Sequence, residues 1–123
     1  MKTLTISVAA YNVERTLEKT LSSFDDPRVY DDLEVLIIDD GSKDNTKKIA
    51  EKYARKAPNT FKYIPKKNGG HGSTINKGIG LASGKYFKVV DGDDWVDTES
   101  LVSFIKKKKK QDSDLVLTNH TEV

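Results

Sequence analysis

Residues 33–42 read LEVLIIDDGS, and they give the strongest indication of the fold class. Its first six residues are almost continuously apolar, which is typical of a β-strand covered on both faces rather than half exposed to water. The strand is predicted to end at Asp39 and Asp40, where Gly41 and Ser42 supply turn residues. A strand covered on both faces lies in a sheet with other elements packed on each side, so the stretch predicts an α/β protein.

Strands and helices are predicted to alternate along the rest of the chain. Further strands are predicted over residues 4–9, 61–64, 86–90 and 115–118. Helices are predicted over residues 13–24, 46–57 and 98–109, with another that contains Ile75, Ile79 and Leu81. Strands separated by helices form right-handed βαβ units, so we expect a mainly parallel sheet.

The composition excludes several classes of protein. Of 123 residues, 21 are Lys or Arg and 19 are Asp or Glu, so the formal net charge is only +2 and no nucleic-acid partner is expected. The absence of cysteine removes disulfides, thiolate zinc sites and cysteine nucleophiles. No stretch approaches the roughly 20 apolar residues that span a bilayer, and Met1 leads into a strand pattern rather than a signal peptide. We therefore expect a soluble, cytoplasmic protein.

A run of five lysines, Lys106 to Lys110, lies at the end of the last predicted helix. The simplest interpretation is a solvated helix end whose positive charges complement the helix dipole. Contact with an anionic membrane or another polyanion is the alternative, so peripheral association with the inner face of the cell membrane stays open.

Polar clusters follow three of the predicted strands. They are Tyr11-Asn12, Asp39-Asp40 and the group of Asp91, Asp93 and Asp94. Ligands bind at the carboxyl ends of the strands in an open parallel sheet, so we expect the three clusters to converge. Each cluster alone has a simpler explanation, because residues 39–42 suit a strand-to-helix turn and residues 91–94 suit a turn that leads to a helix cap at Asp97.

Carboxylates that converge on one crevice repel one another unless a cation or a donor-rich ligand lies among them. Oxygen ligands, in a chain with no cysteine and two histidines, favour Mg²⁺ or Mn²⁺ over zinc. Such ions bind one or two carboxylates and fill their other positions with water and substrate phosphates. The expected ligand is therefore a nucleoside diphosphate.

Other residues near these clusters leave alternatives open. Tyr11 can stack on a base or pack at the end of its strand, and Trp95 can pack beneath the acidic turn or contact the substrate. Residues 69–73, GGHGS, form a loop that leads into a helix N-terminus, a position that favours anions. A P-loop and a G-x-G-x-x-G motif are absent, and an EF-hand is excluded because Asn45 stands at its required glycine.

Three segments resemble the nucleotide-binding half of a family 2 glycosyltransferase with the GT-A fold. They read SVAAYNVERTLEKTLSS (residues 7–23), EVLIIDDGSKDNT (residues 34–46) and KNGGHGSTINKGIGLASGKYFKVVDGDD (residues 67–94). The resemblance covers nearly the whole chain. It implies a Rossmann-like, three-layer α/β/α fold with a mainly parallel sheet, truncated after the Asp-x-Asp region, as one nucleotide-sugar-binding domain over residues 1–123.

The resemblance also implies roles for individual residues. Tyr11 would stack against the base, usually uracil, with Ala9 and Ala10 beside it. Asp40 with Asp39 would accept hydrogen bonds from the base, and Asp91-Gly92-Asp93 corresponds to the Asp-x-Asp element. Nucleotide contacts are implied for Ala9, Tyr11, Asn12, Glu14, Asp39, Asp40, Gly72, Asp91 and Gly92. Contacts to Mn²⁺ or Mg²⁺ are implied for Asp93 and Asp94, without distinguishing which carboxylate binds directly.

Two departures from the family pattern affect this assignment. Ala10 stands where members often have proline, and Thr74-Ile75-Asn76 replaces an Ala-Arg-Asn element, so Lys66, Lys67 or His71 would have to take the place of an arginine near phosphate. The family places its general base and most acceptor contacts in a C-terminal half, which is expected beyond Val123.

The activity that the resemblance implies is inverting transfer of a sugar from a nucleotide-sugar, most simply a UDP-sugar, to a hydroxyl acceptor on a saccharide or lipid-linked glycan. A non-catalytic nucleotide-binding module is the alternative. A receiver-like signalling domain is disfavoured, because such domains place their acidic pair after the first strand and this pair follows the second.

Overall fold

The computed structural model describes residues 2–118, with the side chains of residues 2–110. Its elements are β1 (Leu4–Ala10), α1 (Leu17–Ser22), the 3₁₀ helix η1 (Pro27–Val29), β2 (Leu33–Asp39), α2 (Thr46–Lys56), β3 (Phe61–Pro65), α3 (His71–Leu81), β4 (Tyr86–Asp91) and α4 (Thr98–Thr118). The predicted alternation of strands and helices is confirmed over most of the chain.

Within residues 2–118 the strands form one parallel sheet in the order β3-β2-β1-β4. The register pairs Ala10 of β1 with Asp39 of β2, and Ala9 of β1 with Asp91 of β4. The three strands that carry the polar clusters therefore end at the same edge of the sheet, as expected from parallel βαβ units.

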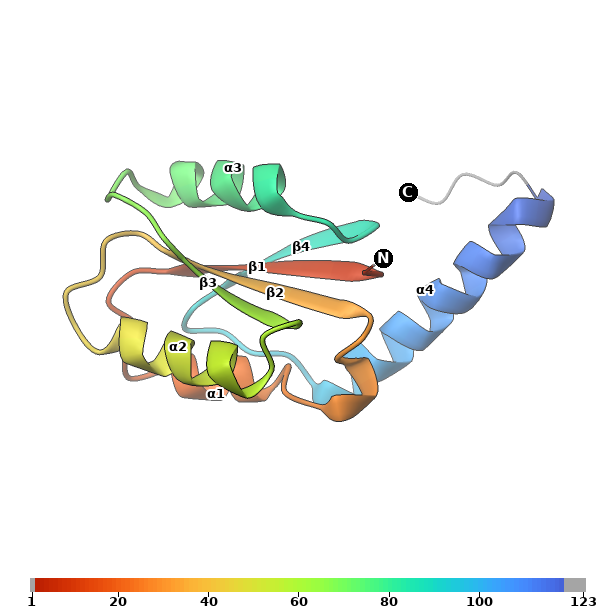
Figure 1. The fold of residues 1–123 in the computed structure, drawn as a ribbon, viewed down its shortest axis with the longest axis horizontal. Helices are drawn as coiled ribbons and strands as arrows, with labels where there is room; N and C mark the ends of the chain where they lie inside the picture. The colour runs from red at the N-terminus through yellow and green to blue at the C-terminus, as the bar shows by residue number, and fades with distance from the viewer. Residues whose placement is uncertain (1, 119–123) are drawn as a thin grey trace.

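Helices cover both faces of the sheet, with α3 on one side and α1 and α2 on the other (Figure 1). All seven residues of β2 are buried, which confirms that this apolar strand is covered on both faces. The larger core lies between the sheet and α1 with α2. It includes Ile6, Val8, Val35, Ile37, Leu17, Leu21, Phe24, Ala50 and Tyr53.

Glu34 is the one acidic residue within the apolar run of β2, and its side chain is only 2% exposed. Its carboxylate accepts hydrogen bonds from Thr5 Oγ1 (2.9 Å), Ser83 N (2.9 Å) and Lys62 Nζ (3.0 Å). Burial alone would raise the pKa of Glu34, but these hydrogen bonds outweigh it and hold the pKa below its usual value. Glu34 thus joins three strands and the segment that follows α3.

α3 lies close to the sheet because Gly78 has no side chain. A Cβ at Gly78 would lie 2.2 Å from Ser7 Oγ and 2.8 Å from Ser7 Cβ. The short distance to Ser7 Cβ means that rotation of the serine hydroxyl would not relieve the contact. Gly78 therefore sets how closely α3 packs on β1.

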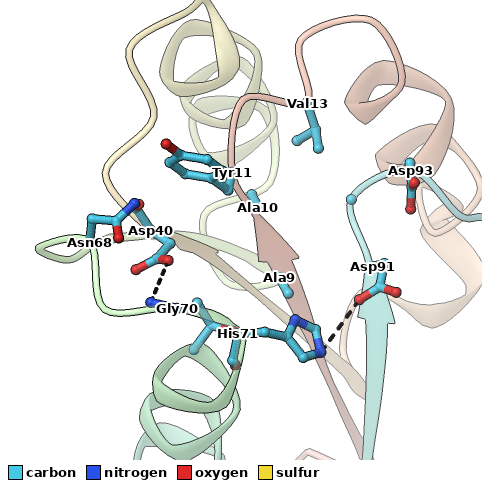
Figure 2. A pocket seen from close by; sticks show the side chains of 12 residues that line it. Ala9, Ala10, Tyr11, Val13, Asp40, Asn68, Gly70, His71, Asp91 and Asp93 are labelled. Carbon is cyan, nitrogen blue, oxygen red and sulfur yellow. Dashed lines mark hydrogen bonds and ion pairs between the residues drawn. The ribbon is translucent and has the colours of Figure 1, made fainter.

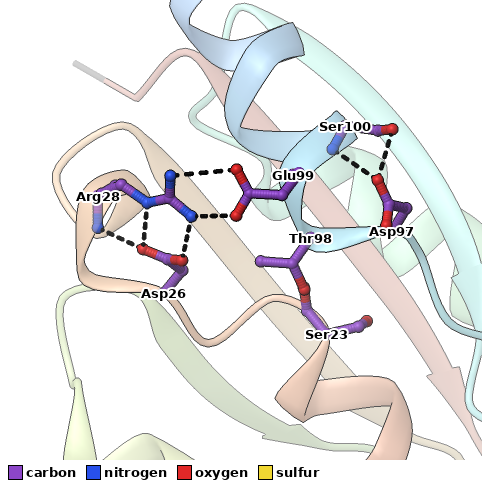
Figure 3. Close-up of polar contacts among 7 residues, drawn as sticks. All are labelled: Ser23, Asp26, Arg28, Asp97, Thr98, Glu99 and Ser100. Carbon is purple, nitrogen blue, oxygen red and sulfur yellow. Dashed lines mark hydrogen bonds and ion pairs between the residues drawn. The ribbon is translucent and has the colours of Figure 1, made fainter.

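α4 begins with the helix cap that the sequence predicts at Asp97 (Figure 3). Asp97 Oδ2 accepts hydrogen bonds from Ser100 N at 2.9 Å and from Ser100 Oγ at 2.7 Å. Arg28 donates from Nε to Asp26 Oδ1 (3.1 Å) and from Nη1 to Glu99 Oε1 (3.2 Å). These contacts tie the start of α4 to η1, at the end of the sheet opposite the polar clusters (Figure 1).

Two elements differ from the predictions. α1 begins at Leu17 rather than residue 13, because the preceding loop is held by a hydrogen bond from Val13 N to Thr46 Oγ1 (2.9 Å) and Asn12 adopts a positive φ of 51°. The strand predicted over residues 115–118 is wrong, because α4 continues to Thr118. No glycine or proline lies between Thr98 and Thr118 to end the helix, and a strand would need a neighbouring strand for its hydrogen bonds.

Replacing Gly78 with alanine should lower the free energy of unfolding by about 1–3 kcal/mol, because the steric overlap with Ser7 outweighs the better helix propensity of alanine. Gly80→Ala is the matched control, since a Cβ at Gly80 meets nothing within 4 Å. It should stabilise the protein by up to about 1 kcal/mol. Urea unfolding measures both, and equal effects of the two substitutions would contradict this account of α3 packing.

Glu34→Gln should lower the free energy of unfolding at pH 7 by about 1–3 kcal/mol, because it removes the charge that three donors stabilise. The lowered pKa of Glu34 means that this stabilisation is present above the unfolded pKa of about 4.3 and is lost as the pH falls through the folded pKa. Unfolding curves at pH 7 and pH 3 should therefore show a smaller difference between wild type and variant at pH 3. Glu51→Gln on α2 serves as the control, and a pH-independent difference for Glu34→Gln would contradict the prediction.

Candidate nucleotide-sugar site

The predicted polar clusters meet in one cleft of about 500 Å³ at the carboxyl edge of the sheet (Figure 2). Its size falls in the range of small-molecule sites. The cleft is lined by Ala9, Ala10, Tyr11, Val13, Asp40, Asn68, Gly70, His71, Thr74, Asp91, Gly92 and Asp93. The predicted convergence of Tyr11, Asp40, Asp91 and Asp93 is therefore confirmed.

Tyr11 forms one wall of the cleft, directly after β1. Its side chain is 51% exposed, so it is not the buried strand-end residue that was the alternative interpretation. An aromatic ring presented to a cleft in this way can stack on a flat heterocycle.

Asp40 is buried directly after β2, where it organises the loop between β3 and α3. Oδ1 accepts hydrogen bonds from Gly69 N and Lys66 Nζ, both at 2.8 Å, and Oδ2 accepts one from Gly70 N at 2.9 Å. Burial would raise the pKa of Asp40, but these donors outweigh it and lower the pKa. Gly70 has a φ of +92°, a backbone conformation that favours glycine.

Lys66 is occupied by this network and is not directed at the cleft. Besides Asp40, its ammonium donates to Ser73 Oγ at 2.8 Å and to the carbonyl of Lys67 at 2.7 Å. Neither Lys66 nor Lys67 lines the cleft, whereas His71 does. Lys66, Lys67 and His71 were the candidates to replace the missing arginine near the phosphates, and the geometry favours His71 for this role.

Asp39 faces away from the cleft, unlike its neighbour. It is buried and accepts hydrogen bonds from Ser42 N at 2.9 Å and Tyr63 Oη at 2.6 Å. Burial, and then the contact with Asp39, raise the pKa of Tyr63. Successive residues at the end of a strand point to opposite faces of the sheet, so Asp39 and Asp40 serve different loops.

Asn12 and Glu14 lie beside the cleft and connect the loop after β1 to the loop after β2. Asn12 N donates to Ser42 Oγ at 2.9 Å, and Asn12 Oδ1 accepts from Lys43 N at 2.9 Å. Glu14 N donates to Asp44 Oδ2 at 3.2 Å. Neither residue is part of the cleft lining, so their contacts in this structure hold the rim in place.

The acidic turn after β4 is fixed against β1 and α1. Gly92 N donates to Ala9 O at 2.9 Å, and Gly92 O accepts from Thr16 Oγ1 at 2.9 Å and Thr20 Oγ1 at 3.0 Å. A Cβ at Gly92 would lie 2.8 Å from Val13 Cγ2, so glycine allows this close approach. The turn thereby presents the exposed carboxylates on either side of Gly92 to the cleft.

His71 begins α3 and lies across the cleft from the acidic turn. Its Nε2 is 3.9 Å from Asp91 Oδ1 (Figure 2). The sequence predicts that this helix starts after the glycine loop, whereas in the structure it starts at His71, within that loop. Gly72, a predicted nucleotide contact, is exposed and does not line the cleft. The imidazole is thus positioned beside the carboxylates.

Asp94 and Trp95 lie outside the cleft, next to it. The interpretation of Trp95 as a residue packed beneath the acidic turn is wrong, because its side chain is 52% exposed. Lys19 Nζ lies 3.6 Å from the centroid of the indole ring, in a cation–π contact.

The carboxylates fit a cation that is shared with a ligand rather than a centre built from protein alone. Among the described side chains, no group of three or more His, Cys, Asp or Glu residues could hold a metal ion. Asp91 and Asp93 supply two carboxylates to the same cleft. A Mg²⁺ or Mn²⁺ ion that also binds phosphate oxygens needs only one or two protein carboxylates. The assignment of the metal to Asp93 or Asp94 stays a prediction.

Four lining residues were not predicted as contacts: Val13, Asn68, Gly70 and Thr74. Asn68 and Gly70 lie in the loop KKNGGHGS, whose glycines were the available signal. The sequence gives no such signal for Val13 and Thr74, because each is predicted to lie in a helix. Only the positions at which the helices start bring these two residues to the cleft.

Comparisons with known proteins agree with this geometry. Residues 5–123 match the protein family described as Glycosyl transferase family 2. The putative glycosyltransferase EpsH of Bacillus subtilis (strain 168) is 36% identical over 117 residues, which are 95% of this chain and 33% of that protein.

Two solved structures are also similar. S. aureus TarS 1-349 in complex with UDP-GlcNAc has a TM-score of 0.71 and 34% identity, covering 87% of this chain and 32% of that one. The mannosyltransferase PcManGT from Pyrobaculum calidifontis, in complex with GDP-Man and Mn²⁺, has a TM-score of 0.69 and 25% identity, covering 85% and 31%. The chain thus spans about a third of the length of each of these proteins.

The match extends over almost the whole chain and includes every segment on which the resemblance was based. The parallel sheet between helical layers is the GT-A fold of the N-terminal part of these enzymes. The chain therefore belongs to glycosyl transferase family 2.

Proposed function

We propose that this chain binds the sugar donor of a glycosyltransferase, and that the donor is a UDP-sugar bound with Mn²⁺ or Mg²⁺. The observation that carries the proposal is that an aromatic ring, that of Tyr11, and the carboxylates of Asp40, Asp91 and Asp93 line one cleft. The UDP-GlcNAc in TarS and the GDP-Man with Mn²⁺ in PcManGT support a nucleotide-sugar and a cation.

The base would lie between Tyr11 and Asp40. A carboxylate offers about four lone-pair positions, and the three donors on Asp40 leave one of them for an N–H group of the base. This arrangement favours a base with a ring N–H donor, such as uracil, over adenine and cytosine, whose ring nitrogens carry no hydrogen in a nucleotide. Because Asp40 is already fixed by the glycine loop, little reorganisation would be needed on binding.

The diphosphate would lie between the first turn of α3 and the acidic turn, over the contact of His71 with Asp91. Asp91 is placed to contact the ribose, and Asp93 is the better candidate for the cation because it lines the cleft while Asp94 does not. A bound cation would supply positive charge to the departing nucleoside diphosphate. His71 and the first turn of α3 would hold the phosphates from the other side, since helix N-termini favour anions.

The proposed reaction is a direct displacement. The acceptor hydroxyl oxygen forms a bond to the anomeric carbon of the sugar as the bond from that carbon to the phosphate oxygen breaks, with inversion at carbon. The hydroxyl proton passes to a general base, and the nucleoside diphosphate leaves. None of the residues that line the cleft is assigned as the general base or as a contact to the saccharide or lipid-linked acceptor.

A donor-binding module without transfer activity of its own is the second candidate. It is favoured by the lining of the cleft, whose residues are assigned to the donor and include no assigned general base. Both candidates place the same ligand in the same cleft, so sugar release from a UDP-sugar in the presence of acceptors separates them.

A cytoplasmic location at the inner face of the membrane stays a prediction. Over residues 2–118, none of the helices combines the length and the apolar character that crossing a membrane requires. The lysine run lies on α4, where Lys109 pairs with Asp32 (3.3 Å) and Lys108 lies over Tyr86 and Phe104.

Mn²⁺ should strengthen UDP binding to the wild type by about tenfold or more, which corresponds to about 1.4 kcal/mol. Asp93→Asn should abolish that gain, because it removes a carboxylate charge from the cation. Isothermal titration calorimetry with and without Mn²⁺ measures the effect. Asp31 precedes β2 at the other end of the sheet, so Asp31→Asn should bind UDP and respond to Mn²⁺ as the wild type does. UDP binding that does not depend on Mn²⁺ in any of the three proteins would contradict the role of Asp93.

Tyr11→Ala should weaken UDP binding by about 1–3 kcal/mol, because it removes the stacking surface for the base. Tyr11→Phe keeps the ring and should bind UDP within about threefold of the wild type. The same calorimetric titration measures both variants, with thermal unfolding as a check of the fold. Unchanged affinity in Tyr11→Ala would show that the base lies elsewhere.

A further inference from the structure

We propose that the lysine run of α4, together with an apolar groove between α4 and the start of β4, is a docking surface for an anionic lipid bilayer. The groove lies toward the amino ends of β1 and β4, whereas the nucleotide cleft lies at their carboxyl ends (Figure 1). The inference therefore concerns a different part of the molecule and does not rest on the proposed donor site.

The lysine run lies in the middle of α4 rather than at its end. α4 continues from Lys110 to Thr118, and no basic residue lies in its last turn. The effect of the helix dipole is confined to the last turn, so the interpretation of these charges as a complement to the dipole is wrong. Lysines three and four positions apart on a helix repel one another, so a run of five favours a nearby anionic partner.

The first turns of α4 attach it to the core, where Leu101, Val102 and Ile105 are buried. The lysine run starts directly after Ile105, and from there α4 extends past the end of the sheet (Figure 1). Successive residues of a helix are about 100° apart, so five lysines cover every side of this part of α4. Such a segment suits a charged surface rather than an apolar interface.

The groove beside the lysine run has a volume of about 470 Å³ and a mainly apolar lining. Phe87 of β4 and Phe104 of α4 both line it, and their side chains are 37% and 39% exposed. Lys108 Nζ lies 5.7 Å from the centroid of the Phe104 ring, so the lysine run borders the groove. Exposed apolar side chains next to lysines are typical of surfaces that lie in the interface of a bilayer.

Positive charge is concentrated around the groove. Residues 84–90 and 100–110, which include its β4 and α4 sides, contain seven lysines and no acidic residue. The rest of the chain has 14 basic and 19 acidic residues, a formal charge of −5. Asp97 also lines the groove, but its carboxylate caps α4 through Ser100. An anionic bilayer would attract this surface and repel the remainder of the molecule, which sets the orientation of docking.

Other occupants match only part of the surface. A second copy of this chain, docked through the same surface, would bring the lysines of both copies together, which is unfavourable. A free polyanion would contact the lysines and leave the apolar groove in water. An anionic bilayer matches both parts, because its phosphate headgroups meet the lysines and its acyl chains meet the aromatic rings.

Cosedimentation with vesicles of phosphatidylcholine, with and without phosphatidylglycerol, tests the proposal. We expect binding only to the vesicles that contain phosphatidylglycerol, and weaker binding as salt is added, because salt screens the lysines. Lys106→Gln, Lys107→Gln and Lys110→Gln combined in one α4 variant should weaken binding about 100-fold, since each lysine near an anionic surface contributes about fivefold.

The matched control removes the same charge from α2. Lys47, Lys48 and Arg55 are exposed and line neither the groove nor the nucleotide cleft. The variant that combines Lys47→Gln, Lys48→Gln and Arg55→Gln should bind the anionic vesicles within about threefold of the wild type, because these residues lie away from the docking surface.

Phe104→Ala tests the apolar part of the surface. It should weaken vesicle binding about five- to tenfold and leave binding to heparin within about twofold, because the ring meets acyl chains only in a bilayer. Thermal unfolding checks the fold of this variant. Trp95 is the only tryptophan, so Phe104→Trp in a Trp95→Phe background gives a second measurement. Its fluorescence should shift to shorter wavelength on anionic vesicles and be quenched by brominated acyl chains.

Several results would overturn the inference. They are equal binding to both kinds of vesicle, unchanged binding of the α4 variant, and a tryptophan at position 104 that stays in water on anionic vesicles. Heparin binding as tight as vesicle binding, with no effect of Phe104→Ala, would assign the surface to a free polyanion. A dimer in solution that the α4 variant abolishes would assign it to a second copy. The α4 variant should bind UDP as the wild type does, so a failure of vesicle binding alone leaves the nucleotide site standing.

Discussion

The Asp40 carboxylate, with the three donors that surround it, joins the end of β2 to the loop that starts α3. Burying a carboxylate is unfavourable, and Gly69 N, Gly70 N and Lys66 Nζ offset this cost while keeping the pKa low. Because Gly70 directly precedes His71, this network sets where α3 begins. The position of His71 opposite the acidic turn, and with it the width of the cleft, depends on Asp40.

The other walls of the cleft are fixed by equally local contacts. Asn12 and Glu14 bind the loop after β2, and Gly92 is held between Ala9 and the hydroxyls of α1. Each loop is therefore anchored to a neighbouring strand end or to the loop that follows a neighbouring strand. A site built this way is largely formed before the ligand arrives, which lowers the cost of binding.

Much of this arrangement could be predicted from the sequence, because the apolar run of β2 requires cover on both faces and parallel strands bring their carboxyl ends together. These two constraints place Tyr11, Asp40, Asp91 and Asp93 at one edge of the sheet. The sequence does not show whether Asp39 or Asp40 faces the cleft. Their side chains point to opposite faces of the sheet, and the sequence does not show which face carries the cleft. Nor could it find Thr74, which reaches the cleft only because α3 begins at His71. The run DLVLT fits a strand or a helix equally well by local pattern, and only the tertiary context decides between them.

The central claim is that side chains from three strand ends jointly bind one nucleoside diphosphate. A crystal structure of the chain with UDP and Mn²⁺ tests it most directly. We expect uracil against Tyr11 and beside Asp40, with the diphosphate and the cation between His71 and Asp93. Electron density for UDP on any other surface, or in the cleft with the base directed at Asp93, would contradict it.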